Sequence, residues 1–192
     1  MADRTTDVGD TAPDFTLRDQ NEGDVALSDF RGKKVVLSFH PLAWTSVCKS
    51  QMQDLEEHGE DFGRLDAVAL GLSVDSVPCK RAWAEAIGIQ ETPLLADFWP
   101  HGGVAQAYGI FREKNGFSER AVFIVDREGV VRFKKIYPMR RSSRRWRNRE
   151  QRAMGWGKRP SATSTRPSWE RPRPTSACSP TPRGRRKRGC PK

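Results

Sequence analysis

Residues 35–57 constrain the fold most, because they set a buried strand directly ahead of a helix. Residues 35–39 read Val-Val-Leu-Ser-Phe, an apolar run typical of a parallel strand covered on both faces. Residues 49–57 continue in a helical pattern, and Cys48 lies in the first turn of that helix. Unpaired N–H groups and the positive end of the helix dipole favour an anion there. Because the thiolate is the reactive form of cysteine, we predict that Cys48 is a reactive thiol.

The elements on either side alternate in a way that predicts an α/β domain. Hairpins are expected around the polar turns at residues 19–24 and 126–129. Gly88 is expected to end a helix that follows Asp75 and Ser76, with Pro78 early in it, where proline is tolerated. The expected strands are residues 13–17, 25–27, 35–39, 66–74, 94–96, 121–125 and 130–136, and further helices are expected at 46–60 and 104–108. This order fits a central mixed sheet flanked by helices.

The composition changes abruptly after Pro138. Residues 1–138 carry 16 Lys and Arg against 22 Asp and Glu, whereas residues 139–192 carry 18 against 2. No Ile, Leu, Val, Phe or Tyr occurs in residues 139–192. Such a segment cannot bury enough apolar surface to offset its conformational entropy. We therefore predict a folded domain at residues 1–138 and a basic, disordered tail at 139–192.

Several ordered motifs resemble those of one enzyme family. The active-site pattern is Pro41-x-x-x-Thr45-x-x-Cys48, and the other matching stretches are residues 12–17, 72–76, 94–97, 107–110 and 120–126. Together they resemble the peroxiredoxins, the alkyl hydroperoxide reductase and thiol-specific antioxidant family, of the E-type or the bacterioferritin-comigratory type. The resemblance covers residues 8–138 and implies a thioredoxin-like fold with an N-terminal β-hairpin extension. It implies a thiol-dependent peroxidase that reduces hydrogen peroxide or organic hydroperoxides.

The resemblance also supplies roles for four residues. Cys48 is expected to attack the peroxide and become a sulfenic acid, although a buried structural cysteine would look alike in sequence. Thr45 is expected to contact the thiolate and orient the peroxide, or to act as an ordinary helix N-cap. Pro41 is expected to exclude water, or only to stiffen its loop. Arg120 is expected to stabilise the thiolate and the developing charge on the peroxide; alone, it would read as a strand-end arginine in solvent.

Cys79 is the candidate resolving cysteine. It lies early in the helix after residues 73–76, where bacterioferritin-comigratory peroxiredoxins place such a residue. Its thiol would attack the oxidised Cys48 to form a disulfide. The alternative is an unreactive thiol in a one-cysteine enzyme of the E-type, because Cα separations above about 7 Å would require local unfolding first. Cys178 and Cys190 lie in the tail and receive no role.

The tail departs from the family pattern, because such folds normally close with a final helix across the sheet. Arg-, Pro-, Ser- and Trp-rich sequence without aliphatic residues is what a GC-rich gene yields in a wrong reading frame. We therefore hypothesise that residues from about 139 are frameshifted and that the closing helix is missing. One sheet face should then be under-packed near Val122, Ile124 and Val131 or their neighbours.

No cofactor or metal site is expected, because the chain has neither a Cys-x-x-Cys motif nor paired histidine ligands. The N-terminus lacks an apolar signal region and no run is long enough to span a membrane, so a cytoplasmic location is expected. The expected partners are a peroxide and a thiol reductant such as thioredoxin or a low-molecular-weight thiol, and a homodimer is compatible with the family.

Three other functions compete with the peroxidase. A thioredoxin-type disulfide reductase would share the fold, but it normally uses the Cys-x-x-Cys motif that this chain lacks. A nucleic-acid binder would act through the basic tail at residues 183–188, which we take for an accident of composition, so nucleic acid is not an expected partner. The third alternative is an inactive, frameshifted peroxiredoxin.

Overall fold

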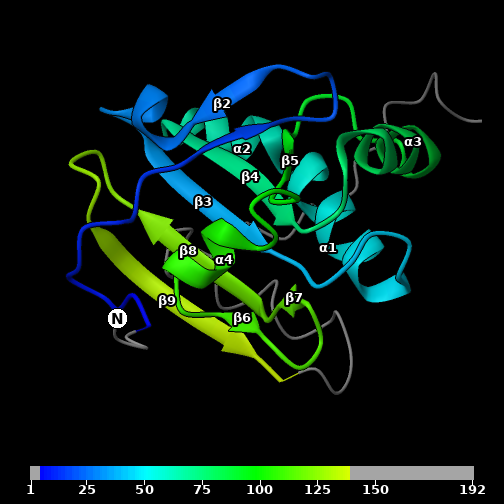
Figure 1. Ribbon diagram of the computed structural model, residues 1–192. Helices are drawn as coiled ribbons and strands as arrows, with labels where there is room; N and C mark the ends of the chain where they lie inside the picture. Colours follow the sequence, from blue (N-terminus) through cyan, green and yellow to red (C-terminus); the bar gives the residue numbers. More distant parts are fainter. Residues whose placement is uncertain (1–4, 139–192) are drawn as a thin grey trace, which may run out of the picture. The chain divides into compact units, whose positions relative to one another are not determined.

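Strand β3 (Lys34–Phe39) is an inner strand of a seven-stranded mixed sheet in the computed structural model, which describes residues 5–138 (Figure 1). The strand order is β2-β1-β5-β4-β3-β8-β9. β3 runs parallel to β4 (Ala67–Ser73), and β4 runs parallel to β5 (Leu94–Ala96). β8 (Arg120–Val125) lies antiparallel on the other side of β3. The predicted mixed sheet is therefore confirmed.

Two hairpins form the edges of this sheet. β1 (Thr16–Arg18) pairs with β2 (Asp24–Ala26) around the predicted polar turn, and this N-terminal hairpin joins β5 through the pair of Arg18 and Ala96. β8 pairs with β9 (Val131–Tyr137) at the opposite edge. A single 3₁₀ turn, Leu27–Phe30, precedes the first central strand. Both predicted hairpins are confirmed.

Helices cover both faces of the sheet. On one face, α1 (Ser46–Glu57), α2 (Gly59–Arg64) and α3 (Val77–Ile87) pack against the even-numbered side chains of β3 and β8. On the other face, α4 (Gly103–Ala107) packs with Leu37, Phe123 and their neighbours. Gly88 ends α3 in the left-handed conformation (φ +76°), as predicted. The helix predicted at 46–60 is divided, because His58 leaves the helical conformation before α2 begins.

A small hairpin was not predicted from the sequence. β6 (Phe111–Arg112) and β7 (Phe117–Ser118) pair antiparallel and form a separate two-stranded sheet. Each strand has only two residues, which is too short to show an alternation of apolar and polar side chains. The Ser118 hydroxyl donates to the His40 carbonyl (3.3 Å), so this hairpin contacts the end of β3.

The predictions for the tail, its disorder, its frameshift and the missing closing helix, lie outside the described residues. The expected loss of cover does not expose Val122, Ile124 or Val131, which are all buried. Among their neighbours, Ile136 of β9, which pairs with Ala121, is 38% exposed. Val131 also packs on the opposite face from Val122 and Ile124. A cavity of about 150 Å³ does lie beside Ile124, lined also by Val36, Leu65 and Ala67.

Candidate active site

Cys48 lies in the first turn of α1, immediately beyond the loop that leaves β3. Its side chain is 1% exposed and packs in the apolar cluster between the helices and the sheet. Thr45, directly before the helix, is extended (φ −100°, ψ 143°), and Trp44 is left-handed (φ +62°). A left-handed conformation is unfavourable for a residue with a side chain, so the surrounding contacts hold this turn in place. The turn presents the thiol at the N-terminus of the helix, where an anion is favoured.

Arg120 is brought to Cys48 by strand pairing, although 72 residues separate them. β8 runs antiparallel to β3 with Ala121 opposite Phe39, so the start of β8 lies where β3 ends and the Cys48 loop begins. The Arg120 guanidinium donates from Nη2 to Cys48 Sγ at 3.4 Å. The structure therefore places a positively charged side chain against a buried thiol.

Gln51 braces this arginine, and we did not predict it as a site residue. Arg120 Nη1 donates to Gln51 Oε1, and Gln51 Nε2 donates to Ser38 Oγ (2.7 Å) and to the Phe39 carbonyl (3.3 Å). Gln51 is buried and lies one helical turn after Cys48. Its spacing from Cys48, together with the lone polar Ser38 in an apolar strand, was the sequence signal that could have identified it.

The other two predicted residues contribute differently. Pro41 is buried beside the end of β3. Thr45 is exposed, and its hydroxyl donates to the Leu42 carbonyl (3.3 Å) instead of making a side-chain cap bond to the helix. The Thr45 carbonyl accepts the Lys49 N–H (2.9 Å) and so begins the helix. The structure thus brings together Cys48 and Arg120, while the Thr45 hydroxyl bonds within its own loop.

The second thiol, Cys79, lies in the first turn of α3 and is partly buried. Cys48 and Cys79 are both free and contact the same apolar cluster. The Cys79 thiol donates to Asp75 Oδ1 (3.8 Å). Asp75 Oδ2 accepts the Ser73 hydroxyl (2.6 Å) and the Ala43 N–H (2.8 Å). One carboxylate therefore joins the second thiol to the loop that precedes the first.

A comparison with known protein families identifies the family of this chain. The model of the AhpC/TSA family matches residues 8–134, which include both thiols, the loop between β3 and α1, and Arg120. The chain belongs to the AhpC/TSA family. It is a peroxiredoxin, a thiol-dependent peroxidase with a thioredoxin-like fold.

Relatives of the peroxiredoxin agree with this assignment. It is 50% identical over 127 residues to alkyl hydroperoxide reductase E of Mycobacterium tuberculosis, covering 66% of this chain and 82% of that protein. It is 38% identical over 141 residues to mouse peroxiredoxin-2, covering 69% and 70% of the two chains. Among solved structures, AhpC of Enterococcus faecalis superimposes with a TM-score of 0.69 at 29% identity, covering 79% of this chain and 91% of that one. These matches favour the peroxidase over the disulfide reductase and the nucleic-acid binder.

Two buried basic side chains lie near the thiols of the peroxiredoxin. His40 follows β3, is fully buried and packs on the Trp83 ring (centroids 5.3 Å apart). Its burial, and then the charges of Lys80 and Arg120, hold the pKa of the imidazole well below its ordinary value, so it is neutral. Lys80, on α3, is also fully buried, and its burial lowers the pKa of the ammonium to about 8. Sequence analysis had assigned no role to Lys80.

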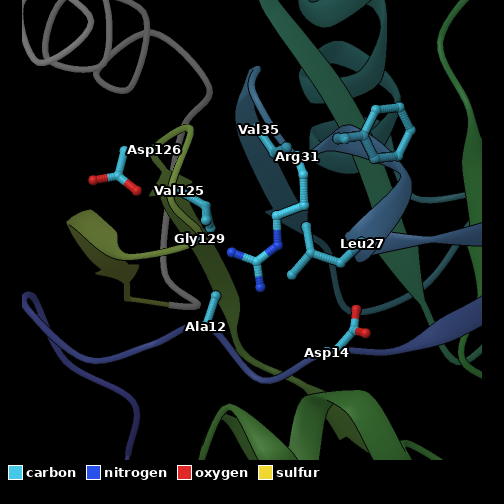
Figure 2. A pocket seen from close by; sticks show the side chains of 9 residues that line it. Ala12, Asp14, Leu27, Arg31, Val35, Val125, Asp126 and Gly129 are labelled. Atoms are coloured by element: carbon cyan, nitrogen blue, oxygen red, sulfur yellow. The ribbon is translucent and has the colours of Figure 1, made fainter.

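A small pocket at the far end of β3 is separate from this site. It is lined by Val35 at the start of β3, by Val125 at the end of β8, and by Gly129, and the Arg31 side chain points into it (Figure 2). Its volume is about 10 Å³, which is room for about one water molecule. It cannot hold a peroxide substrate together with a reactive group. Residues 5–138 contain no cluster of metal-ligating side chains and no helix that could cross a membrane.

Proposed function

We propose that Cys48 is the peroxidatic residue and that the substrate is hydrogen peroxide or an organic hydroperoxide. The observation that carries this proposal is the Arg120 guanidinium 3.4 Å from a buried thiol at a helix N-terminus. The Cys48 thiolate attacks the terminal peroxide oxygen, an S–O bond forms and the O–O bond breaks. The leaving oxygen takes a proton and departs as water or an alcohol. Cys48 is left as a sulfenic acid.

Arg120 acts on both partners in this step. Its charge favours the thiolate before the reaction and the oxygen that becomes negative during it. Gln51 accepts from the other terminal nitrogen of the guanidinium, so the charge is already in place when peroxide arrives. Such preorganisation spares the site the cost of reorienting a flexible side chain during the reaction.

Pro41 and Thr45 support the same chemistry from the loop. Pro41 is buried and has no N–H, so it helps to keep water away from the thiol without leaving a donor unpaired. The Thr45 hydroxyl can turn from the Leu42 carbonyl to a bound peroxide, because it is exposed and its present bond is long at 3.3 Å. We assign Thr45 the role of orienting the peroxide oxygens.

Cys79 is proposed to resolve the sulfenic acid as an intramolecular disulfide. Its support is that both thiols contact one apolar cluster and that Asp75 joins Cys79 to the loop before Cys48. Thioredoxin or a low-molecular-weight thiol would then reduce the disulfide. Without Cys79, a thiol reductant must act directly on the sulfenic acid.

A homodimer is proposed on a separate observation. Trp44 and Trp99 are 60% and 81% exposed, and Phe98, next to Trp99, is 53% exposed. Large apolar side chains exposed to this degree are typical of contact surfaces. Sedimentation of the chain and of a Trp99→Ser variant tests this, since equal monomeric mass for both would contradict it.

The roles of the two cysteines are tested with paired variants. Cys48→Ser should abolish peroxide consumption, because a hydroxyl is a far weaker nucleophile than a thiolate. The fold should persist, because serine and cysteine have similar volumes. Cys79→Ser should still consume one equivalent of peroxide and should accumulate a Cys48 sulfenic acid, which mass spectrometry of a trapped adduct detects. Peroxide turnover by Cys48→Ser would refute the assignment of Cys48. A wild-type chain that forms no Cys48–Cys79 disulfide would refute only the assignment of Cys79.

A further inference from the structure

The loop of residues 40–45 leads from β3 to the helix that holds Cys48, and a carboxylate from another part of the chain holds the middle of this loop. The Ala43 N–H donates to Asp75 Oδ2 at 2.8 Å. The Ala43 side chain is 5% exposed and packs in the same apolar cluster as Cys48. A backbone N–H that is turned away from water needs an acceptor, and Asp75 supplies it.

The parallel pairing of β3 and β4 brings Asp75 to this loop. Phe39 pairs with Leu72, so the segments that follow the two strands leave the sheet at the same edge. Ser73 ends β4, and Asp75 follows two residues later. The Ser73 hydroxyl, which is 1% exposed, donates to the same Oδ2 at 2.6 Å. The oxygen that holds the loop is therefore itself held from the core.

The backbone next to Ala43 needs such support. Trp44 adopts a left-handed conformation (φ +62°), which is unfavourable for a residue with a side chain and persists only where the surrounding structure holds it. The Trp44 side chain is 60% exposed, so its own packing gives little of this support. The bond to Asp75 fixes the neighbouring residue and thereby helps to hold the turn that leads into Cys48.

The two oxygens of Asp75 have different partners. Oδ2 accepts from Ala43 and Ser73, whereas Oδ1 accepts from the Cys79 thiol at 3.8 Å. An asparagine at this position would keep one oxygen, which can replace Oδ2, and would place its amide nitrogen near the sulfur. The bond to the loop can therefore be kept while the charge is removed.

We propose that Asp75 is a positioning residue for the reaction of Cys48 with peroxide. By holding Ala43, it sets the path of the loop into α1 and so keeps Cys48 Sγ 3.4 Å from the Arg120 guanidinium. This inference rests on the proposed function of Cys48. A displacement of about 1 Å in a reacting group can slow a reaction about a hundredfold, so a loosened loop is expected to lower the rate.

The test compares Asp75→Ala with Asp75→Asn in the full-length protein. Rapid mixing with hydrogen peroxide gives the second-order rate constant for Cys48 oxidation, and NMR gives the rate at which the Ala43 amide exchanges with deuterium. Asp75→Ala removes the acceptor, whereas Asp75→Asn keeps it.

Asp126→Ala is the matched control. The Asp126 carboxylate also accepts backbone N–H groups, from Glu128 (3.0 Å) and Val130 (2.8 Å). It follows β8 at the end opposite Arg120, so its loss should lower the thermal midpoint without changing the rate of Cys48 oxidation.

We expect Asp75→Ala to oxidise Cys48 about tenfold more slowly than wild type and to exchange the Ala43 amide faster. Asp75→Asn should stay close to wild type in both measurements, which would assign the effect to the hydrogen bond and not to the charge. If Asp75→Ala fails to fold, amide exchange in the wild type and in Asp75→Asn carries the test, because Ala43 must then be protected in both.

A wild-type rate in Asp75→Ala would overturn the proposal. So would a rate in Asp75→Asn as low as that of the alanine variant, an unprotected Ala43 amide in the wild type, or an equal loss of rate in Asp126→Ala. Absence of Cys48 oxidation in the wild type would instead refute the proposed function, on which this inference depends.

Discussion

Replacement of Arg120 by methionine tests the electrostatic basis of the site most directly. The guanidinium nitrogen lies 3.4 Å from Cys48 Sγ, and Coulomb's law at an effective dielectric constant of about 20 gives roughly 5 kcal/mol for two unit charges at that distance. The cost of withdrawing the arginine from water offsets part of this attraction, and hydrogen bonds to charged groups contribute about 1.5–3 kcal/mol net. We therefore expect Arg120→Met to slow the reaction of Cys48 with peroxide by about 10- to 100-fold.

The assay is the second-order rate constant for Cys48 oxidation, measured by rapid mixing of reduced protein with excess peroxide. Arg120→Lys should be intermediate, because it keeps a positive charge but cannot bond the thiol and Gln51 with a planar fork. Arg127→Met is the control, since Arg127 follows the other end of β8 and pairs with Asp66 at 3.0 Å. An unchanged rate in Arg120→Met, with the rate of Arg127→Met also unchanged, would show that the contact with the thiol plays no part in the chemistry.

Three further predictions concern the glutamine that braces Arg120, the packing of β4 against α1, and a carboxylate at the end of α1. Gln51→Leu should lower the peroxide rate constant about tenfold, because Arg120 loses its brace; rapid mixing measures it, and a wild-type rate would contradict it. Gly71→Ala should destabilise the fold by about 1–3 kcal/mol, because the new Cβ would meet the Met52 sulfur of α1 at 2.6 Å. Its thermal unfolding midpoint should therefore fall. Gly63→Ala is the control: open space surrounds Gly63 in α2, so alanine there should raise the midpoint. Burial tends to raise the pKa of Glu56, but hydrogen bonds from three N–H groups lower it overall. The Glu56 carboxylate therefore stabilises the fold fully above pH 4.5, and this stabilisation is lost as the pH falls through the lowered pKa of the folded state. Glu56→Gln should lower the free energy of unfolding by about 1 kcal/mol at neutral pH and not at all in acid. Denaturant midpoints measure this, and a difference between the two proteins that does not change with pH would contradict it.

The sheet was predictable because the sequences of its inner strands are apolar throughout most of their length, as expected for strands that are buried on both faces. Residues 35–39 and 66–74 are long apolar runs, and both became buried parallel strands. The division of the first long helix at His58 was not predictable, because it depends on one backbone conformation and not on the spacing of apolar side chains. The β6–β7 hairpin escaped prediction because strands of two residues carry no periodic signal.

The site was predictable only in the part that a short motif carries. The resemblance indicated Cys48 and Arg120 as site residues, and the structure brings their side chains into contact. Gln51 and Asp75 were not predicted, because each acts through contacts with residues from other elements. Lys80 was not predicted because its burial depends on the packing of α3. A glutamine or a lysine within an amphipathic helix reads as a surface residue until the packing shows that it is buried.

The pairing register of β3 and β8 links the fold to the chemistry. Successive side chains of a strand point to opposite faces, so Arg120, Val122 and Ile124 share the face on which α1 packs, while Ala121 and Phe123 face α4. Ser38 lies opposite Val122 on that same face and bonds Gln51. A slip of one residue would turn the Arg120 side chain away from Cys48 and would bring alanine toward the thiol. The same slip would move the apolar side chains of β8 to the opposite faces of the sheet. The packing of these side chains therefore fixes the register of β8, and the register in turn holds the Arg120 guanidinium beside the thiol.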